Sequence, residues 1–437
     1  MQYTPRFVSN LSLLLLQIAV IIAVCRLATP LFAKLRQPPV IAEMMVGILL
    51  GPSFFGWLAP QLSARLFPDS SLPTLSIISQ VGLVLFMFLV GWRLDVGHLR
   101  SIGRLALVIS LVSIVVPFTL GSTVASVAWY PYAPAHVGLL PLSLFMGAAM
   151  SITAFPVLVR ILDDQRLLRS SVGTLAVACA AFDDATGWLI LAGITAVARS
   201  GSVAEAWIPL LALAVYGVVM MSLVRPLLWR IARQRGAAFG AAPADFGVIL
   251  IVMLLSAWAT EVMGVHALFG AFFAGAVMPR ATDAERAFSA SVEPLVTALL
   301  LPLFFAFSGL RTSVQLISTA ALWGQTFLIL AVAVIGKGVG SGIATRVMGT
   351  PWRDAALIGV LLNTRGLVEL VVLNIGLDLG ILSPVLFSMM VMMALATTIA
   401  TSPLVSLIKS REASLQIGAS TAPARGASTP RRSAARL

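Results

Sequence analysis

The stretch that decides the fold is VACAAFDDATGWLILAG, residues 177–193, in which two adjacent acids, Asp183 and Asp184, interrupt an apolar run. The run is part of a segment long enough to span a membrane, which takes about 20 apolar residues. Charged side chains inside a membrane are costly, and they usually face a partner or a water-filled cavity. The two acids therefore predict a functional site within a membrane-spanning helix.

The composition supports a membrane protein. Of 437 residues, 59% are hydrophobic and 11% charged, and the mean hydropathy is +1.00, whereas soluble domains have about a quarter of charged residues. The formal charge of +12 does not indicate a nucleic-acid partner, because the basic residues lie in short loops and a tail. Cys25 and Cys179 lie in apolar runs, which predicts neither a disulfide framework nor a metal site.

Thirteen windows of the chain are apolar enough to be membrane-spanning helices. They lie near residues 10–33, 39–57, 73–92, 103–130, 138–162, 171–198, 206–229, 246–263, 265–279, 291–310, 318–345, 352–377 and 382–408. We therefore predict an all-α polytopic membrane protein with about thirteen transmembrane helices after a short outer N-terminus, 1–9. The first run lacks the flanks of a cleavable signal peptide and is taken as the first span.

The basic residues predict the orientation. With the N-terminus outside, sixteen of the 29 Lys and Arg fall in inner loops and four in outer segments. Because Lys and Arg gather in cytoplasmic loops, we expect a multi-pass protein of the cell (inner or plasma) membrane with a cytoplasmic C-terminus. The last segment, 411–437, is rich in Ala, Ser, Arg and Pro without hydrophobic periodicity, so a disordered basic tail near anionic headgroups is expected.

Several charged side chains fall inside the predicted spans. The acids are Glu43, Asp183, Asp184 and Glu369, and the bases are Arg26, Lys337 and Arg365. Glu369 follows Arg365 by four residues, the spacing of a same-face helical pair, so a structural or coupling ion pair is expected there. Glu43 is a possible further site residue, for which a structural hydrogen-bonding role is favoured.

Adjacent residues of a helix point about 100° apart. One of the two aspartates can therefore face a water-filled cavity while the other pairs with a base from another helix. Desolvation disfavours the charged form of a carboxylate, so such an acid can hold a proton near neutral pH and exchange it for Na⁺ or K⁺. The alternative is an Asp–Lys pair that only holds helices together.

Two predicted spans carry helix breakers in mid-run. One contains SITAFPVLV (151–159), with Thr153 close to Pro156, and the other contains LLNTRGLVEL (361–370). Proline removes a backbone donor, so the freed carbonyls and the Thr153 hydroxyl are candidate cation ligands. Paired interrupted helices indicate a midplane site between inverted repeats, in which spans 2–6 mirror spans 9–13.

These residues resemble those of the monovalent cation/proton antiporter-2 family, most closely the branch of plant cation/proton exchangers and their bacterial relatives. The resemblance covers roughly residues 10–410. It depends on seven blocks in family order: QPPVIAEMMVGILLGPS, VGLVLFMFLVGWRLD, SITAFPVLVRIL, AAFDDATGWLILA, HALFGAFFAGAVMPR, FFAFSGLRTSV and NTRGLVELVVLNIGL.

The resemblance implies a sodium/proton antiporter-like fold in a homodimer. A dimerisation scaffold, about 10–92 and 206–310, would hold a core, about 103–198 and 318–408, that carries the ion by an elevator-like movement. No cofactor and no catalytic residue is implied.

The resemblance also implies roles for four residues. Asp184 matches the acid found throughout the family, Asp183 the variable position before it, and Lys337 the core lysine that pairs with the first acid in electrogenic members. Thr153 matches the threonine of the unwound helix. The Asp-Asp pair resembles the electrogenic sodium type, while the flanking blocks resemble potassium-type exchangers, so the choice of cation and the stoichiometry stay open.

The function expected is that of a secondary active antiporter, not an enzyme, exchanging Na⁺ or K⁺ for H⁺ by alternating access. A channel-like cation conductor and a proton-coupled exporter of an organic cation are the alternatives. An intramembrane aspartyl protease is disfavoured, because such enzymes take their two acids from separate helices and no second mid-span Asp lies on another helix.

Overall fold

A computed structural model describes residues 10–35, 37–93, 103–200, 207–235, 243–279 and 283–420, and every regular element in them is helical. The first half comprises α1 (Asn10–Lys34), α2 (Pro39–Leu50), α3 (Phe55–Leu58), α4 (Pro60–Leu66), α5 (Leu72–Arg93), α7 (Arg104–Val124), α8 (Leu139–Ser151), α9 (Phe155–Asp164) and α10 (Ser171–Ser200). The second half comprises α11 (Trp207–Val219), α12 (Arg225–Arg235), α13 (Pro243–Val262), α14 (Ala267–Val277), α15 (Asp283–Leu295), α16 (Leu301–Leu310), α17 (Ala320–Ala333), α18 (Gly340–Val347), α19 (Trp352–Leu362), α20 (Leu367–Asp378) and α21 (Pro384–Ser420).

Within the described residues, eleven helical stretches are long and apolar enough to cross a membrane, and α8 and α14 are shorter apolar helices. Each of the thirteen predicted windows overlaps one of these, so the polytopic all-α class is confirmed. The number of crossings stays a prediction, because α8 and α14 are too short to count by length alone.

Several long helices contain a π-helical segment. The segments are η1 (Ala125–Trp129), η3 (Met220–Val224), η5 (Val296–Leu300) and η7 (Val334–Val339). A π-helical segment inserts a residue into the helical repeat and re-aims the side chains around it, and such segments are frequent at functional sites. The last one, η7, joins α17 to α18 and carries Lys337, which it turns inward so that the side chain is fully buried.

Two pairs of helices are interrupted where the sequence predicted breakers. The chain leaves the helical conformation between α8 and α9, where Ile152 is extended (φ −77°, ψ 137°), and again between α19 and α20. The two breaks touch: the Ala154 amide donates to the Thr364 carbonyl at 3.0 Å. Four helix ends thus meet at one point, which we call the crossing.

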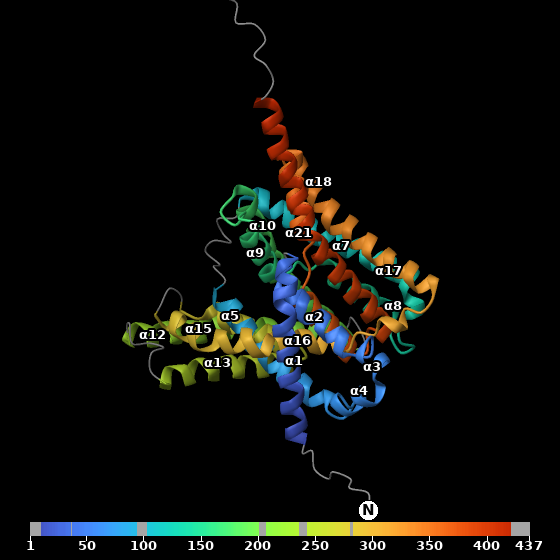
Figure 1. Ribbon diagram of the computed structural model, residues 1–437. Coiled ribbons are helices and arrows are strands. Elements are labelled where there is room, and N and C mark those ends of the chain that lie inside the picture. Colours follow the sequence, from blue (N-terminus) through green and yellow to red (C-terminus); the bar gives the residue numbers. More distant parts are fainter. Residues whose placement is uncertain are drawn as a thin grey trace, which may run out of the picture.

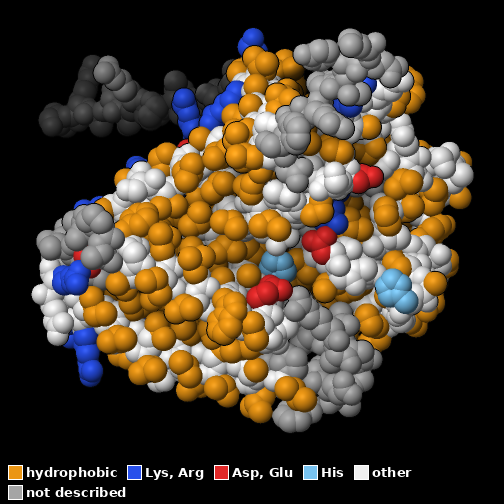
Figure 2. All heavy atoms as spheres, turned by 90° about the horizontal axis from the view of Figure 1, so that it is seen from below, with side chains coloured by type: hydrophobic (Ala, Val, Ile, Leu, Met, Phe, Trp, Pro, Cys, Tyr) orange, Lys and Arg blue, Asp and Glu red, His pale blue; other side chains and the backbone are white. Residues whose placement is uncertain are grey.

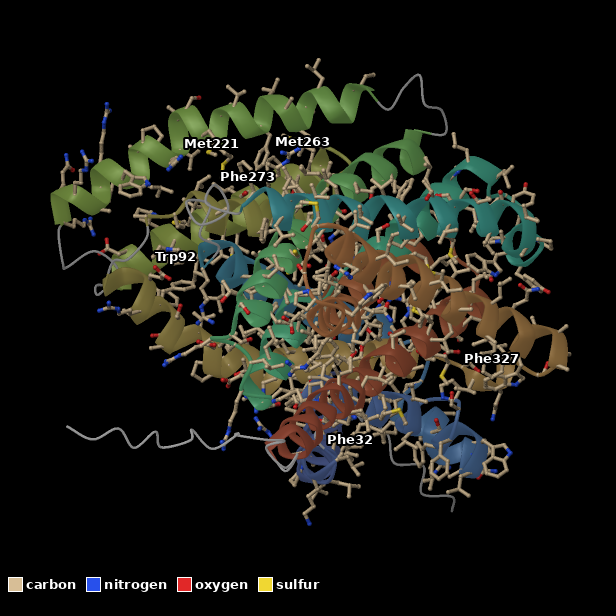
Figure 3. All side chains as sticks on the ribbon, turned by 90° about the horizontal axis from the view of Figure 1, so that it is seen from above. Phe32, Trp92, Met221, Met263, Phe273 and Phe327 are labelled. Atoms are coloured by element: carbon tan, nitrogen blue, oxygen red, sulfur yellow. The ribbon has the colours of Figure 1, made fainter. Side chains whose placement is uncertain are left out.

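Figure 1 shows how the helices surround the crossing. α5, α13, α15 and α16 form one group, α7, α17, α18 and α21 form a second, and α1 passes in front of the first. In Figure 3 the side chains of Trp92, Met221 and Phe273 lie on the side of the first group, and Phe327 of α17 lies on the opposite side. Most residues of α19 and α20 are buried, so the crossing lies at the centre of the molecule.

The surface fits a lipid environment. Figure 2 shows a face largely covered by hydrophobic side chains, with several Lys and Arg side chains toward its margins. Leu27, Val218 and Trp258 are among the large apolar side chains that are more than 60% exposed. Surfaces of this kind are unfavourable in water and favourable against acyl chains, so the chain is a multi-pass membrane protein.

Two pairs of helices outside the crossing pack closely against each other, α2 with α16 and α5 with α14. Each contact is made at glycine: a Cβ built on Gly47 would lie 2.2 Å from the Ala306 oxygen, and one on Gly91 would lie 2.0 Å from the Phe272 oxygen. Small residues allow such close approach of membrane helices. In the predicted inverted repeat, spans 2 and 3 (α2 and α5) correspond to spans 9 and 10 (α14 and α16). The α2–α16 contact in one orientation therefore corresponds to the α14–α5 contact in the other.

We expect Gly91→Ala to lower the thermal stability of the protein, because the added methyl group would overlap the α14 backbone. Overpacking of this kind costs about 1–3 kcal/mol. Gly217→Ala on α11 is the matched control, since a Cβ there meets no atom within 4 Å. Thermal unfolding in detergent compares the two variants, and equal midpoints would contradict the tight α5–α14 contact.

α21 is longer than expected. It continues to Ser420, so its last turns replace the beginning of the segment 411–437 that was predicted to be a disordered tail. Residues 411–416, Arg-Glu-Ala-Ser-Leu-Gln, are mostly good helix formers, which explains the extension. Residues 1–9 and 421–437, and thus the rest of the tail prediction, lie outside the described residues.

Candidate functional site

Asp183 lies in the middle of α10 and is enclosed by three other segments. Its Oδ2 atom accepts hydrogen bonds from the Ser113 hydroxyl of α7 at 2.7 Å and from the Thr153 hydroxyl at 2.8 Å. The Lys337 Nζ atom is 3.2 Å away, and both charged side chains are fully buried. The structure thus places Asp183, Thr153 and Lys337 together, as an Asp–Lys pair braced by two hydroxyl groups.

Lys337 also holds the end of a half-helix. Its ammonium group donates to the Ser113 carbonyl at 3.0 Å and to the Ser151 carbonyl. Ser151 is the last residue of α8, whose final carbonyls have no intrahelical partner because the chain leaves the helix there. A cation at this position is stabilised by the negative end of the helix dipole.

Asp184 takes a different position, next to the start of α9. The Phe155 amide, at the first residue of α9, hydrogen-bonds its carboxylate, and a helix N-terminus favours an anion. The side chain is 6% exposed. No described residue donates to Asp184 Oδ1 or to Asp183 Oδ1, although both atoms are buried.

Arg365 and Glu369 form a second buried pair. The Arg365 Nη1 atom lies 3.1 Å from Glu369 Oε1, and neither side chain is exposed. Arg365 also donates to the Ala149 carbonyl at 3.1 Å and the Met150 carbonyl at 2.8 Å. These carbonyls belong to the last turn of α8, so Arg365 and Lys337 together neutralise the end of that half-helix.

Glu369 lies in the first turn of α20, where a helix N-terminus again favours a negative charge. Its Oε2 atom has no donor among the described residues. The Thr398 hydroxyl of α21 donates to the Arg365 carbonyl at 2.6 Å and accepts from its amide at 3.0 Å. The pair is therefore a fixed part of the crossing that connects three helices.

The crossing carries three acids, Asp183, Asp184 and Glu369, against two bases, Lys337 and Arg365, all of them buried. When all five are ionised, one negative charge is left over. A single buried charge is costly unless it is neutralised, and either one proton or one monovalent cation achieves that.

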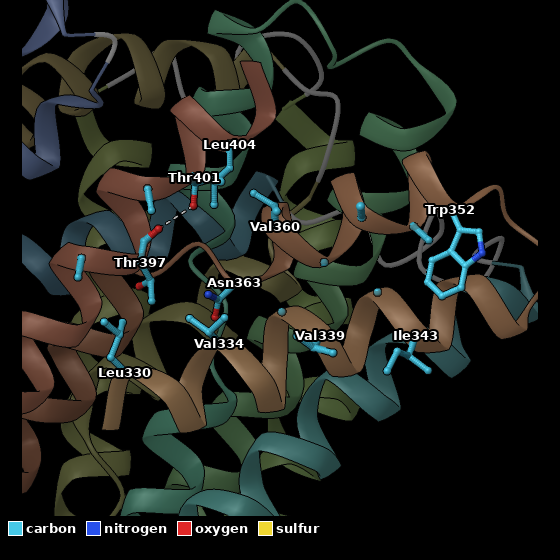
Figure 4. A pocket seen from close by; sticks show the side chains of 17 residues that line it. Leu330, Val334, Val339, Ile343, Trp352, Val360, Asn363, Thr397, Thr401 and Leu404 are labelled. Carbon is cyan, nitrogen blue, oxygen red and sulfur yellow. Dashed lines mark hydrogen bonds between the residues drawn. The ribbon is translucent and has the colours of Figure 1, made fainter. Parts of the chain in front are cut away.

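Two oxygen atoms at the second break were not singled out from the sequence as site atoms. Asn363 Oδ1 and Thr364 Oγ1 are buried without a hydrogen-bond partner among the described residues. Asn363 also lines a cavity of about 440 Å³ between α17–α18, α19 and α21, whose other walls are mostly apolar (Figure 4). Neither aspartate lines that cavity, so it is not where their free oxygens point.

Glu43 is not brought to the crossing. It is buried on α2, and its carboxylate interacts electrostatically with Arg26 of α1. No hydrogen bond or ion pair connects Glu43 with a crossing residue in the described part of the chain. Its role as a site residue stays a prediction, with less support than those of the two aspartates.

A polar cluster that sequence reasoning missed joins α16 to α20. Arg311, directly after α16, lies 2.6 Å from the Asp378 carboxylate and donates to Asn374 Oδ1 at 3.1 Å. Asn374 in turn donates to the Ser308 hydroxyl of α16 at 2.8 Å. The cluster thus ties α16 to α20, one of the helices of the crossing.

Comparison with known proteins connects this geometry with a family. A family model described as "Sodium/hydrogen exchanger, transmembrane" matches residues 19–407. The chain belongs to the sodium/hydrogen exchanger family. The family is one of membrane antiporters, so the chain is a membrane transporter, and the resemblance to cation/proton antiporters found in the sequence is confirmed.

Individual members of the exchanger family are also similar to the chain. The "Na(+)/H(+) antiporter NhaS4" of Synechocystis is 43% identical over 398 residues, with 91% of this chain and 97% of the relative covered. "Cation/H(+) antiporter 20" of Arabidopsis thaliana and "K(+)/H(+) antiporter 1" of Saccharomyces cerevisiae are 40% and 34% identical. These two alignments cover 91% and 92% of this chain but 48% and 47% of the relatives, so the chain spans about half their length.

A solved exchanger structure has the same fold. The sodium proton antiporter MjNhaP1 from Methanocaldococcus jannaschii superposes with a TM-score of 0.66 at 14% sequence identity, over 91% of this chain and 96% of that one. The antiporter-like fold implied by the family resemblance is thus confirmed.

Proposed function

We propose that this chain exchanges Na⁺ or K⁺ for H⁺ across a cell membrane, with cation and proton competing for Asp184. The observation that carries the proposal is the buried Asp184 carboxylate at the start of α9, with an oxygen to which no described residue donates. A buried carboxylate oxygen without a donor needs either a proton or a cation. Similarity to exchangers named for Na⁺ and for K⁺ supports the same chemistry.

The charge balance at the crossing supports exchange rather than joint transport. The five buried ionisable groups leave one negative charge, and one proton or one monovalent cation restores neutrality. Carrying both at once, or neither, would leave a charge buried in the membrane, which is unfavourable. Thr153, Asp183, and the free oxygens of Asn363 and Thr364 are the further candidate ligands.

Movement of the crossing helices relative to the scaffold would expose Asp184 to each side in turn. The core is formed by about 103–198 and 318–408, and the scaffold by about 10–92 and 206–310. The N-terminus lies outside and the C-terminus in the cytoplasm, as the distribution of basic residues favours. The protein is a homodimer in this proposal, formed through the scaffold.

Transport in proteoliposomes tests the proposal. With an imposed pH gradient, addition of Na⁺ or K⁺ should dissipate the gradient, and the effect should disappear when neither ion is present. Each alkali cation is assayed with and without a membrane potential. A cation current that flows without proton movement would identify a channel and overturn the antiport.

We expect Asp183→Asn to reduce exchange by about tenfold, the scale of one lost charge-assisted hydrogen bond, and to lower the charge moved per cycle. In the parent protein Lys337 can release its proton when a cation displaces it from Asp183. This adds a second proton to the cycle, and because neutrality with one bound cation requires a protonated Lys337, it leaves one negative charge at the crossing while the cation is bound. With Asn at 183 only the Asp184 proton is exchanged. Charge movement per cation is measured from the dependence of flux on membrane potential. An unchanged dependence in the variant would show that Lys337 contributes no proton.

A further inference from the structure

A second cavity, of about 530 Å³, lies where α1 ends, α2 begins and α9 ends. No crossing residue lines it. Thr29 of α1 and Gln37 of the α1–α2 connection form one wall. The other wall is formed by α9, the turn that follows it, and α21, through Arg160, Asp164, Arg166 and Lys409. The cavity therefore lies between α1 and α2 on one side and α9 and α21 on the other.

The cavity is strongly basic. Three cationic side chains line it against one acid, and this acid, Asp164, is already paired with Arg160 at 3.4 Å. Lys409 donates to the Gln165 carbonyl at 2.6 Å, which leaves two of its three donors. Among the described residues no carboxylate pairs with Arg166 or Lys409. Net positive charge in a concave site attracts an anion.

The backbone at Arg166 is unusual. Its φ is +57°, and in the described part of the chain no other residue except glycine has a positive φ. The turn is fixed by hydrogen bonds from the Arg166 amide to the Asp163 carbonyl and from the Leu167 amide to the Leu162 carbonyl. Glycine is the residue usually found in this conformation after a helix. An arginine here is strained, and such strain is typical of positions whose side chain has a function.

Gln37 adds a polar contact on the opposite wall. Its amide group donates to the Ile399 carbonyl of α21 at 3.1 Å, and its Oε1 atom is buried with no donor among the described residues. An amide oxygen of this kind can accept a hydrogen bond from a hydroxyl group of a ligand. The wall of α1–α2 and the wall of α9–α21 thus offer complementary groups: an acceptor on one and cations on the other.

We propose that this cavity binds a ligand that has a phosphate group and a hydroxyl group. Arg166, Lys409 and Arg160 would hold the phosphate group. Guanidinium and ammonium groups bind phosphate oxygens through short charge-assisted hydrogen bonds. Basic pockets between membrane helices at the cytoplasmic side accept anionic headgroups, and the proposed orientation puts this cavity there.

A bound phosphate would connect α1–α2 with α9 and α21, and would slow exchange by resisting their relative movement. This regulatory consequence rests on the proposed function, whereas binding does not. The phosphate can belong to a lipid headgroup or to a soluble phosphate, and the two sources are distinguished by the arms of one experiment.

The experiment uses the full chain in phosphatidylcholine nanodiscs. In the soluble arm, inorganic phosphate is titrated at constant ionic strength and the thermal midpoint is followed. In the lipid arm, phosphatidylglycerol replaces part of the phosphatidylcholine, and the lipid retained by the purified protein is quantified. Exchange in vesicles of the same compositions is measured separately.

Arg166→Gly is the decisive variant, because it removes the side chain while glycine adopts the same backbone conformation without strain. Lys409→Gln is the second, since Gln keeps a donor for the Gln165 carbonyl. Arg169→Gln is the matched control: Arg169 is exposed near the same turn but does not line the cavity. Each of the first two variants should weaken binding by about tenfold, and the control should bind like the parent.

Loss of the phosphate response in Arg166→Gly identifies a soluble phosphate site, and loss of phosphatidylglycerol retention identifies a headgroup site. Binding that is absent in both arms, or unchanged in both variants, overturns the proposal. A protein that binds phosphate as expected but exchanges no cation would retain this site and lose the proposed function. A protein that exchanges cations but does not bind phosphate would retain the proposed function and lose this site.

Discussion

The variant Asp184→Asn should lose cation/proton exchange entirely, down to the background of protein-free liposomes. Asparagine preserves the size of the side chain and can still face the Phe155 amide, but it cannot release a proton or supply the charge that holds a cation. The variant therefore removes the carboxylate for which proton and cation are proposed to compete, and exchange depends on that competition.

Loss of activity is informative only if the variant is folded and inserted. Thermal unfolding and gel filtration of the purified protein establish this, and Asp184→Asn should be at least as stable as the parent because it removes a buried charge. Asp69→Asn, at an exposed position in the α4–α5 connection, is the matched control and should exchange normally. Substantial exchange by folded Asp184→Asn would refute the role of this carboxylate.

The crossing could be predicted from the sequence because its components violate local rules. Asp183 and Asp184 are charges in an apolar run, and Pro156 and Gly366 are breakers in spans that should be continuous. Each violation is visible without knowing the fold, and violations of this kind concentrate at functional sites. The sequence therefore indicated which helices are interrupted and which acids to examine.

The Asp183–Lys337 and Arg365–Glu369 pairs were expected, but the sequence could not provide the other partners of these side chains. That Lys337 binds the end of α8 depends on contacts between segments far apart in the chain, and on a π-helical segment with no evident sequence pattern. The Arg311–Asp378 pair looks like two ordinary loop charges until α16 and α20 are placed side by side. The tight contacts at Gly47 and Gly91 have the same origin: a glycine in a span is uninformative until the opposing backbone is known.

The second large effect is on stability. We expect Lys337→Ala to lower the free energy of unfolding by about 3–5 kcal/mol, the usual cost of removing one partner from a buried ion pair. The loss would leave the Asp183 carboxylate with only two hydroxyl donors and the Ser113 and Ser151 carbonyls without their ammonium donor. It would also remove one of the two cations at the end of α8. Thermal unfolding in detergent measures the change, with Lys34→Ala at the exposed end of α1 as the control.

A double-mutant cycle separates the ion pair from the rest of this effect. In Asp183→Asn/Lys337→Ala no unpaired charge is left at this position, so the double variant should recover a large part of the stability lost in Lys337→Ala. Recovery would be incomplete, because the Ser113 and Ser151 carbonyls still lack a donor. If the two substitutions were additive instead, Lys337 would stabilise the protein through the end of α8 alone. The proposed release of its proton by cation binding at Asp183 would then have no energetic basis, since that release requires the two charges to depend on each other.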